Sequence, residues 1–358
     1  MGLRRRNTGE ARRVAPVLAL SFVLLSVWGC VPPTSTKQQS ETRLLLDTVC
    51  TVTLYDPDAA PELAAMALDL CQEYEDLLSR TREGSDVWRI NHAQGQAVDV
   101  DPRTAEVIRE GLAFGAFSGG LFDITVGRLS ALWGFGEADP RPPADSELEA
   151  ALETVDYRRV TVTGNTVRLE NPQAWLDLGG IAKGYIADRM AAFLKDNGVR
   201  SALIDLGGDI ATVGGKPEDG AWRIGIRNPV RDGGELLGVL RTGETSVVTS
   251  GVYERRFVVD GVAFHHILDP RSGYPVRTDV SSATVLSENA MSGDALSTIL
   301  LLVGSENASD TLERATGVVG AVLLLDNGEV LQFGEVSFSL SSPSSDPPVE
   351  SLPPLGQE

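Results

Sequence analysis

One carboxylate and two hydroxyls form the first group of side chains whose spacing could support chemistry. Asp294, Ser297 and Thr298 open an apolar stretch that runs to Val303. In a helix, residues four positions apart lie on one face, so Asp294 and Thr298 would point the same way, with Ser297 beside them. Such hard oxygen donors suit Mg²⁺, which takes further oxygens from backbone, water or phosphate. The spacing fits equally a helix whose first turn is charged by Asp294 and whose Thr298 only packs, so both interpretations stay open.

A glycine turn forms the second group. The segment 177–184 reads DLGGIAKG and follows a short apolar run. Glycines let a backbone approach a ligand closely, and the N–H groups at a helix start, together with Lys183, would attract a phosphate. Asp177 could accept a hydrogen bond from a hydroxyl or a ring N–H. A purely structural turn explains these residues about as well, because neither GxGxxG nor GxxxxGK[ST] is present.

Two adjacent histidines form the third group. His265 and His266 precede the turn that begins at Asp269-Pro270. Neighbouring strand residues point to opposite faces, so only one imidazole can face a given cleft, where it could act as an acid or base near neutral pH. A structural histidine is the commoner outcome, and His92, in a polar loop, is a weaker candidate. The sequence has no GxSxG or HExxH motif, which argues against the common hydrolase schemes.

The elements that must position these groups follow no regular alternation. Apolar spacing predicts helices over 61–78, 102–117, 145–154, 181–194 and 290–303. Alternating or β-branched runs predict strands over 44–55, 175–178, 202–206, 222–227, 246–250, 256–259, 264–268 and 282–286, with hairpins over 160–169 and 318–333. Many strands with interspersed helices, mostly without β-α-β order, predict an α+β fold with mixed or antiparallel sheets.

Composition and charge limit the class of partner. The chain has 358 residues, of which 42% are hydrophobic, and 31 Lys and Arg stand against 50 Asp and Glu, a net charge of −19. This is a globular composition, long enough for one large domain or two modest ones. An acidic body argues against nucleic acid as a partner, because phosphate binding relies on clustered Lys and Arg.

The N-terminal segment differs from the rest. Residues 1–29 contain five arginines and one glutamate, followed by an apolar core from Ala15 to Val27. This predicts a signal peptide over 1–29, too short to span a bilayer comfortably. Cys30 stands where a bacterial lipobox places the lipidated residue, although a plain signal peptide remains an alternative. We therefore expect an exported lipoprotein, anchored at the membrane on the extracytoplasmic face, with a flexible tether over 30–43.

Two thiols and the C-terminal segment complete the outline. Cys50 and Cys71 lie in a predicted strand and a predicted helix, and we expect them to be buried and free, because sequence cannot bring their Cα atoms within bonding distance. No spacing of Cys and His suggests zinc. The Ser/Pro-rich segment 336–358 has nothing to bury, and we expect it to be disordered.

Eight short motifs occur in a characteristic order. They read LDT at 46–48, SRT at 79–81, FDITVG at 122–127, DLGGIAKGY at 177–185, DLGG at 205–208, TSG at 249–251, HILDPRSG at 266–273 and DALST at 294–298. Together they resemble the ApbE family of Mg²⁺-dependent FAD:protein FMN transferases. The resemblance covers residues 44–335 and implies an ApbE-like flavin transferase fold there.

The resemblance also implies a reaction and a site. Members attach FMN, taken from FAD, through a phosphoester to a Thr or Ser of target proteins such as subunits of ion-pumping redox complexes, releasing AMP. The positions that match the FAD site of the family are Leu46, Thr81, Leu121, Phe122, Asp123, Asp177, Lys183 and Leu268. The positions that match its Mg²⁺ ligands are Gly180, Asp294, Ser297 and Thr298. His266 is the candidate to take the proton of the acceptor hydroxyl.

The resemblance leaves some alternatives open. Some members have a Thr at the position of Gly180 and an acidic residue at that of Ser297, so the ligand count and the number of Mg²⁺ ions stay open. Hydrolysis of FAD to FMN and AMP is one alternative activity. A lipoprotein that binds a flavin without catalysis, or one that binds a different solute, would be of another class.

Overall fold

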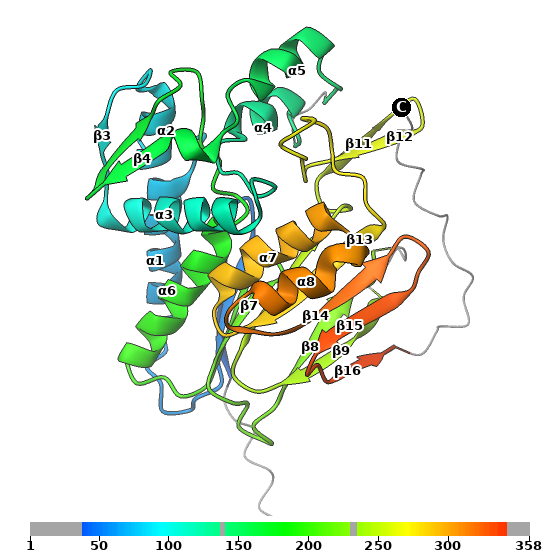
Figure 1. The fold of residues 1–358 in the computed structure, drawn as a ribbon. Helices are drawn as coiled ribbons and strands as arrows, with labels where there is room; N and C mark the ends of the chain where they lie inside the picture. The colour runs from blue at the N-terminus through cyan, green and yellow to red at the C-terminus, as the bar shows by residue number, and fades with distance from the viewer. Residues whose placement is uncertain (1–37, 137–139, 230–234, 342–358) are drawn as a thin grey trace, which may run out of the picture. The chain divides into compact units, whose positions relative to one another are not determined.

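The computed structural model describes residues 38–136, 140–229 and 235–341. The chain divides into a unit of residues 1–35 and a unit of residues 36–358, and every described residue belongs to the second unit. The predicted signal peptide, Cys30 and residues 342–358 lie outside the described residues. Within the second unit, helices are interspersed among the strands without regular alternation, as Figure 1 shows.

An eight-stranded sheet forms the centre of this unit, and all its neighbouring strands are antiparallel. In spatial order its strands are β1 (Gln39–Leu45), β2 (Thr48–Leu54), β6 (Ala202–Leu206), β7 (Asp209–Val213), β10 (Ser246–Gly251), β13 (Val280–Ser287), β14 (Val318–Leu325) and β15 (Val330–Gly334). The central strand β13 is buried along its whole length, which requires other layers to cover both faces of the sheet.

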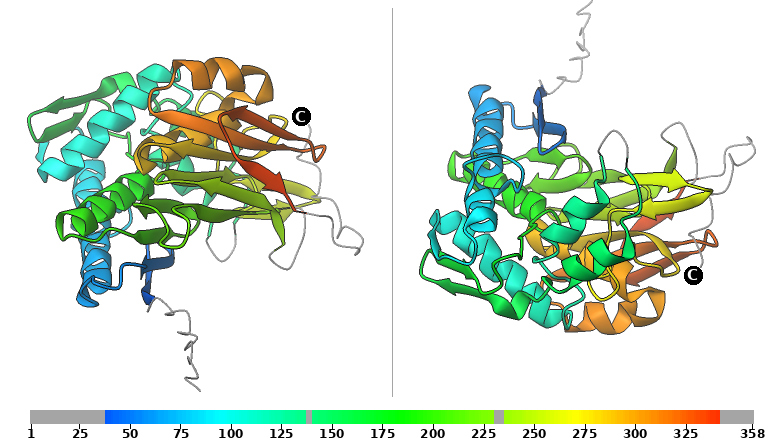
Figure 2. Two further views of the ribbon diagram at one scale, coloured as in Figure 1. Left: turned by 90° about the horizontal axis from the view of Figure 1, so that it is seen from below. Right: turned by 90° about the horizontal axis from the view of Figure 1, so that it is seen from above.

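Helices cover one face of this sheet. The helices are α1 (Glu62–Leu78), α2 (Asp86–His92), α3 (Pro102–Phe117), α4 (Gly127–Trp133), α5 (Asp145–Leu152), α6 (Ala182–Asp196), α7 (Ala290–Val303) and α8 (Ala308–Arg314). The main core lies between the sheet and α1, α6 and α7, whose ribbons lie beside the sheet in the views of Figure 2. Most residues of α7 are buried, and most of these are apolar. A helix that is apolar on nearly all sides is typical of a core position.

A smaller sheet covers the other face. Its strands are β8 (Trp222–Arg227), β9 (Leu236–Thr242) and β16 (Phe338–Leu340). Trp222 and Leu240 from this sheet pack against Val247 and Leu286 of the large sheet. Alternating residues of one strand therefore serve two cores, since Val248, the neighbour of Val247, belongs to the core under the helices.

Two further small sheets lie outside these layers. One is formed by β3 (Val98–Asp99), β5 (Thr166–Leu169) and β4 (Val160–Thr163). The other is the hairpin of β11 (Arg256–Val259) and β12 (Val262–His265), which packs with Trp133 over a third apolar cluster. The predicted α+β class is confirmed, and the helix expected over 102–117 is confirmed to the residue.

The structure corrects three predictions of local structure. The strand predicted over 44–55 is two strands, because Leu46 and Asp47 adopt φ angles of 54° and 57° and reverse the chain. The segment 175–178 is not a strand, and its only ladder contact is a single bridge from Trp175 to Val126. The polar segment 79–93 contains α2, whose start is capped by Ser85, a short helix that apolar spacing did not reveal.

The structure also moves the boundaries of the predicted tether and tail. Strand β1 begins at Gln39, inside the segment expected to be flexible, because its outward hydroxyls pair across the hairpin, as in the 3.0 Å contact of Thr42 with Thr51. Strand β16 lies inside the segment expected to be disordered, and it is held by pairing with β9 and by packing of Phe338. Both β1 and β16 lie at the edge of a sheet, and polar edge strands carry a weak sequence signal because few apolar residues mark them.

Two remaining expectations concern the cysteines and membrane spans. Cys50 and Cys71 are free and fully buried, as predicted. Within the described residues, none of the helices combines the length and the apolar composition that crossing a bilayer requires.

Candidate functional site

A cleft of about 1100 Å³ collects segments that are far apart in the sequence. Its walls come from the β1–β2 turn, the segments 79–81 and 121–126, the start of α6, the β6–β7 turn, the end of β10 and α7. All the predicted site residues within the described chain line this cleft except Ser297: Leu46, Thr81, Leu121, Phe122, Asp123, Asp177, Gly180, Lys183, His266, Leu268, Asp294 and Thr298. The structure therefore brings one nearly complete set of predicted residues together.

The glycine turn before α6 fixes one wall of the cleft. Asp177 accepts a hydrogen bond from the Gly179 N–H at 2.9 Å, and its other oxygen lies 3.1 Å from the Arg80 Nε. A Cβ at Gly180 would lie 3.0 Å from the ring of Phe122, so the glycine permits a close approach of these two segments. The carboxylate of Asp177 is thus held by groups from two different loops.

Lys183 lies at the start of α6 and has a partner that the sequence analysis did not identify. Its ammonium forms an ion pair with Asp209, whose carboxylate is 1% exposed. Burial alone would lower the pKa of Lys183, but the carboxylates of Asp209 and Asp294 outweigh it and raise the pKa, so the side chain stays charged. The sequence signal was the Gly207-Gly208 pair, which turns β6 directly into β7 and places Asp209 opposite α6.

Asp294 and its neighbouring hydroxyls form a buried polar corner. The Asp294 Oδ2 accepts a hydrogen bond from the Gly184 N–H at 2.9 Å, and the residue is 3% exposed. Burial, with the nearby carboxylate of Asp209, raises the pKa of Asp294 to about 7. Asp209 and Asp294 share the ammonium group of Lys183, so a further cation bound here would favour the ionised form of Asp294.

The hydroxyls beside Asp294 are linked by short contacts. The Ser250 Oγ lies 2.8 Å from the Ser297 Oγ and 3.3 Å from the Thr298 Oγ1. Ser297 is fully buried and donates to the Asp294 carbonyl, so its hydroxyl lies behind the cleft wall and Ser250 lies on the wall in its place. Ser250 belongs to the TSG motif, and the sequence analysis gave it no role.

The donor set suits a hard divalent ion that shares its shell with a ligand. Among the described residues, no group of three or more His, Cys, Asp and Glu side chains could hold a metal by itself. One carboxylate, a hydroxyl and a backbone carbonyl would leave several positions for water or phosphate oxygens, which is the usual way in which Mg²⁺ binds. Asp294, Thr298 and Gly180 therefore fit Mg²⁺ in combination with a phosphate ligand.

The two histidines have different surroundings. His265 is 1% exposed, its Nε2 lies 3.0 Å from the Val276 carbonyl, and burial lowers its pKa to about 4. His266 lines the cleft, and burial lowers its pKa to about 3, so its imidazole is neutral at neutral pH. Among the described residues, the Nδ1 atoms of both histidines are buried without a hydrogen-bond partner, and only that of His266 belongs to a residue that lines the cleft. A buried polar atom of this kind normally has a partner, and a bound molecule can supply it.

The carboxylate of Asp123 bonds to protein groups and not into the cleft. Its Oδ1 accepts from the Thr125 N–H and hydroxyl at 2.8 and 2.6 Å, and its Oδ2 accepts from the Tyr157 N–H at 2.9 Å. Burial raises the pKa of Asp123. Both carboxylate oxygens thus fix the 121–126 loop, so Asp123 shapes the cleft wall through its backbone.

The cleft also contains charged side chains from the β8 and β10 ends. Arg227, Glu254 and Arg255 line it and are exposed. Tyr253 lies beside them, and burial raises the pKa of its phenol. The sequence motifs did not identify these residues, because they lie far from the motifs along the chain and only the folding of the sheets brings them to the cleft.

Comparisons with known proteins agree on one family. The model of the ApbE family matches residues 46–323. The FAD:protein FMN transferase of Klebsiella pneumoniae is 36% identical, over 82% of this chain and 90% of that protein. The FAD:protein FMN transferase of Treponema pallidum is 34% identical, over 84% of this chain and 88% of that protein.

Solved structures give the same result for the fold. The ApbE protein of Thermotoga maritima superimposes with a TM-score of 0.76 and 32% identity, over 84% of this chain and 97% of that one. The flavin transferase ApbE of Vibrio cholerae superimposes with a TM-score of 0.73 and 28% identity, over 83% of this chain and 96% of that one.

Proposed function

Because the chain belongs to the ApbE family, we propose that it transfers FMN from FAD to acceptor proteins. The finer form of the proposal is a Mg²⁺-dependent reaction in which the acceptor is a Thr or Ser hydroxyl, the product is a phosphoester and AMP is released. The observation that carries it is the joint position of Lys183, Asp294 and Thr298 in one cleft with the residues that match the FAD site of the family.

Three groups would hold the phosphates of FAD. Lys183 brings a positive charge fixed by Asp209, and the positive end of the α6 dipole lies next to it. Asp294, Thr298 and the Gly180 carbonyl would hold Mg²⁺, which when bound neutralises charge on the pyrophosphate and favours departure of AMP. Most of the rate enhancement would then come from positioning and from electrostatics rather than from covalent catalysis.

His266 would accept the proton of the acceptor hydroxyl. The acceptor oxygen attacks the phosphorus of the FMN moiety, the phosphorus–oxygen bond to AMP breaks, and the hydroxyl proton passes to the neutral imidazole. With a pKa of about 3, the imidazole of His266 by itself is a weak base. An anionic dinucleotide next to the ring would stabilise the imidazolium and raise that pKa, so the residue becomes a better base when the substrate is bound.

A labelling assay tests the function directly. The protein is incubated with FAD, Mg²⁺ and the FMN-free form of a redox-pump subunit that carries covalent FMN when mature, and intact mass and in-gel fluorescence are recorded. We expect the subunit to gain the mass of one FMN. Release of FMN and AMP without labelling would indicate the hydrolase instead, and bound FAD without turnover would indicate a flavin-binding lipoprotein.

Removal of Mg²⁺, or of the carboxylate of Asp294, tests whether the reaction depends on a metal. With EDTA, or in Asp294→Ala, we expect labelling to stop while the fold persists. Ser309→Ala is a matched control, since Ser309 is an exposed residue on α8 outside the cleft. Full labelling by Asp294→Ala would remove this residue from the ligand set.

We also propose that the protein is exported and held at a membrane by a lipid on Cys30. The support is the sequence alone: a basic head, an apolar core and a cysteine after Gly29. Growth with a radioactive fatty acid should label the wild type and leave Cys30→Ala unlabelled. Equal labelling of both would refute the anchor at this residue.

A further inference from the structure

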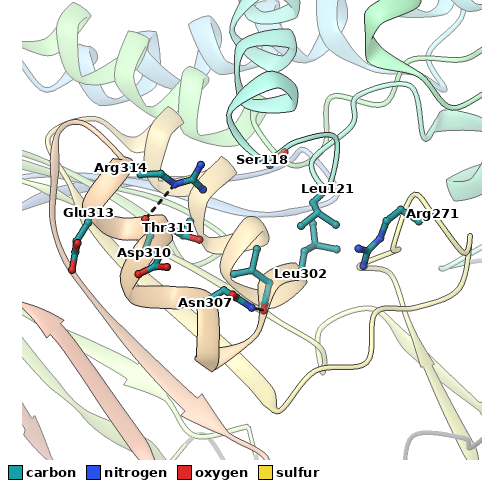
Figure 3. Close-up of a pocket in the computed structure, with 10 residues that line it drawn as sticks. Ser118, Leu121, Arg271, Leu302, Asn307, Asp310, Thr311, Glu313 and Arg314 are labelled. Carbon is teal, nitrogen blue, oxygen red and sulfur yellow. Dashed lines mark hydrogen bonds between the residues drawn. The ribbon is translucent and has the colours of Figure 1, made fainter.

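A second hollow, which we name the side groove, lies next to the cleft. It has a volume of about 810 Å³ and is bounded by the end of α3, the end of α7, α8 and the side chain of Arg271 (Figure 3). Leu121 and Leu302 line both hollows, and Figure 3 shows these two side chains next to each other. The side groove is therefore continuous with the cleft across two leucines.

The spacing along α7 places the side groove close to the proposed site of reaction. Asp294, Thr298 and Leu302 follow one another at intervals of four residues and all line the cleft. Four helical residues advance about 6 Å, whereas one residue of an extended chain spans about 3.5 Å. We name the buried polar corner formed by Asp294 and Thr298 the metal corner. A polypeptide whose hydroxyl lies at the metal corner would bring its second or third neighbouring residue to the side groove.

The walls of the side groove offer both donors and acceptors. Arg271 is held by Asp269 through bonds of 2.9 and 2.7 Å. Arg314 lies over the ring of Phe117 at 4.9 Å, and its Nε donates to the Asp310 carbonyl at 3.3 Å. Both guanidinium groups are therefore held in place, which lowers the entropy lost when they bind a partner.

The charges of the side groove are mixed. Arg271 and Arg314 stand with Asp310 and Glu313, and Asn307 adds an amide. A phosphate or an acidic ligand would meet two carboxylates, and an apolar ligand would cover charged groups without pairing them. The backbone of an extended polypeptide suits this wall, because its carbonyls accept from arginine and its N–H groups donate to carboxylates.

We propose that the side groove binds the stretch of acceptor polypeptide that flanks the flavin-receiving hydroxyl. The inference rests on the proposed transferase function and assigns it a second substrate site. It predicts that a bulky side chain in the side groove weakens binding of the acceptor and leaves the affinity for FAD unchanged.

Two matched variants test this. Asp310→Trp places an indole in the side groove. Glu306→Trp makes the same change of charge and nearly the same change of size at an exposed position of the neighbouring 3₁₀ turn, Ser305–Asn307, outside the groove. With the FMN-free redox-pump subunit as acceptor, we expect Asp310→Trp to raise the KM for the acceptor about tenfold, as the loss of a modest contact region does. The Kd for FAD should stay at the wild-type value in both variants.

The outcomes separate the two proposals. An unchanged acceptor KM in Asp310→Trp, or an equal loss of FAD affinity, would overturn the side groove as an acceptor site. If the wild type does not label the subunit, the transferase proposal fails, and calorimetric titration of the FAD-loaded protein with the subunit still tests the groove. If the wild type and Glu306→Trp bind the subunit and Asp310→Trp binds it more weakly, the result supports the side groove as the acceptor site. Equal binding by all three proteins, or no binding by the wild type, refutes it.

Discussion

At the scale of single residues, burial decides which of two like side chains is available for chemistry. His265 and His266 are neighbours, and the Nδ1 atoms of both rings are buried without a partner, but only His266 lines the cleft, whereas the His265 Nε2 is tied to the Val276 carbonyl. The same holds for two aspartates: both oxygens of Asp123 accept from the protein, one from Thr125 and the other from the Tyr157 N–H, whereas Asp294 accepts from the Gly184 N–H through one oxygen.

Replacement of His266 by alanine should abolish transfer and keep FAD binding. We expect labelling to fall by about 10² to 10⁴, the usual loss when a positioned base is removed, with an unchanged Kd for FAD. Single-turnover labelling and a separate FAD titration measure the two quantities. His92→Ala, at an exposed position on α2, is the control and should label at the wild-type rate. A wild-type rate in His266→Ala would take this residue out of the reaction.

Replacement of His265 by glutamine should flatten the dependence of stability on pH. The folded-state pKa of about 4 lies below the unfolded value of about 6.5, so between these values the unfolded chain binds more protons and the free energy of unfolding rises with pH. The effect is about 3 kcal/mol across the window, and Gln retains a donor for Val276. Chemical denaturation at pH 4.5 and 7.5 measures it; an identical slope in both proteins would mean that His265 is not the cause.

At the scale of elements, the contact between α6 and α7 assembles the metal corner. Gly184 of α6 donates to Asp294 of α7, and a Cβ at Gly184 would lie 2.3 Å from the Ala290 carbonyl oxygen. Asp188 of α6 accepts from the N–H groups of Ala290 and Met291, which start α7. The two helices therefore share hydrogen bonds at the point where the ligands of the proposed site lie.

Gly184→Ala should destabilise the protein although alanine favours a helix. The gain in helix propensity is about 1 kcal/mol and forcing apart two backbones in a packed core costs about 3 kcal/mol, so we expect a net loss of about 2 kcal/mol in the free energy of unfolding. Thermal and chemical unfolding measure the change. Gly243→Ala, where a Cβ would meet no atom within 4 Å, should remain close to the wild type. Equal stability of both variants would show that α6 and α7 can separate freely.

At the scale of the described unit, three layers hold the cleft in place. Helices and a second sheet cover the two faces of the central sheet, and β16, from the end of the described chain, closes the second sheet by pairing with β9. The C-terminal segment is therefore part of the fold at least as far as Leu340, although its composition suggested disorder from residue 336.

Two truncations test this boundary. A chain that ends at residue 341 keeps β16 and should unfold like the full protein. A chain that ends at residue 335 loses the strand and the packing of Phe338, which should cost about 2 kcal/mol and lower the melting temperature by several degrees. Calorimetry on both checks the difference, and identical melting would mean that β16 contributes nothing to stability.

The sequence predicted the helices and strands with strong periodicity and most of the residues that line the cleft. Helices such as 61–78 and 290–303 follow from apolar spacing, and the hairpin over 160–169 follows from its Gly-Asn turn. Residue types and their order along the chain also predicted the cleft residues, because the ordered motifs resemble one family.

Only the tertiary structure decided which atoms of these residues are free. Asp209 meets Lys183, and Ser250 replaces Ser297 at the cleft surface, because strands of the central sheet bring distant segments together. The side groove and the strand β16 depend likewise on partners far away in the chain. Local sequence determines propensity and chemical type, whereas burial and pairing arise from contacts that no local pattern contains.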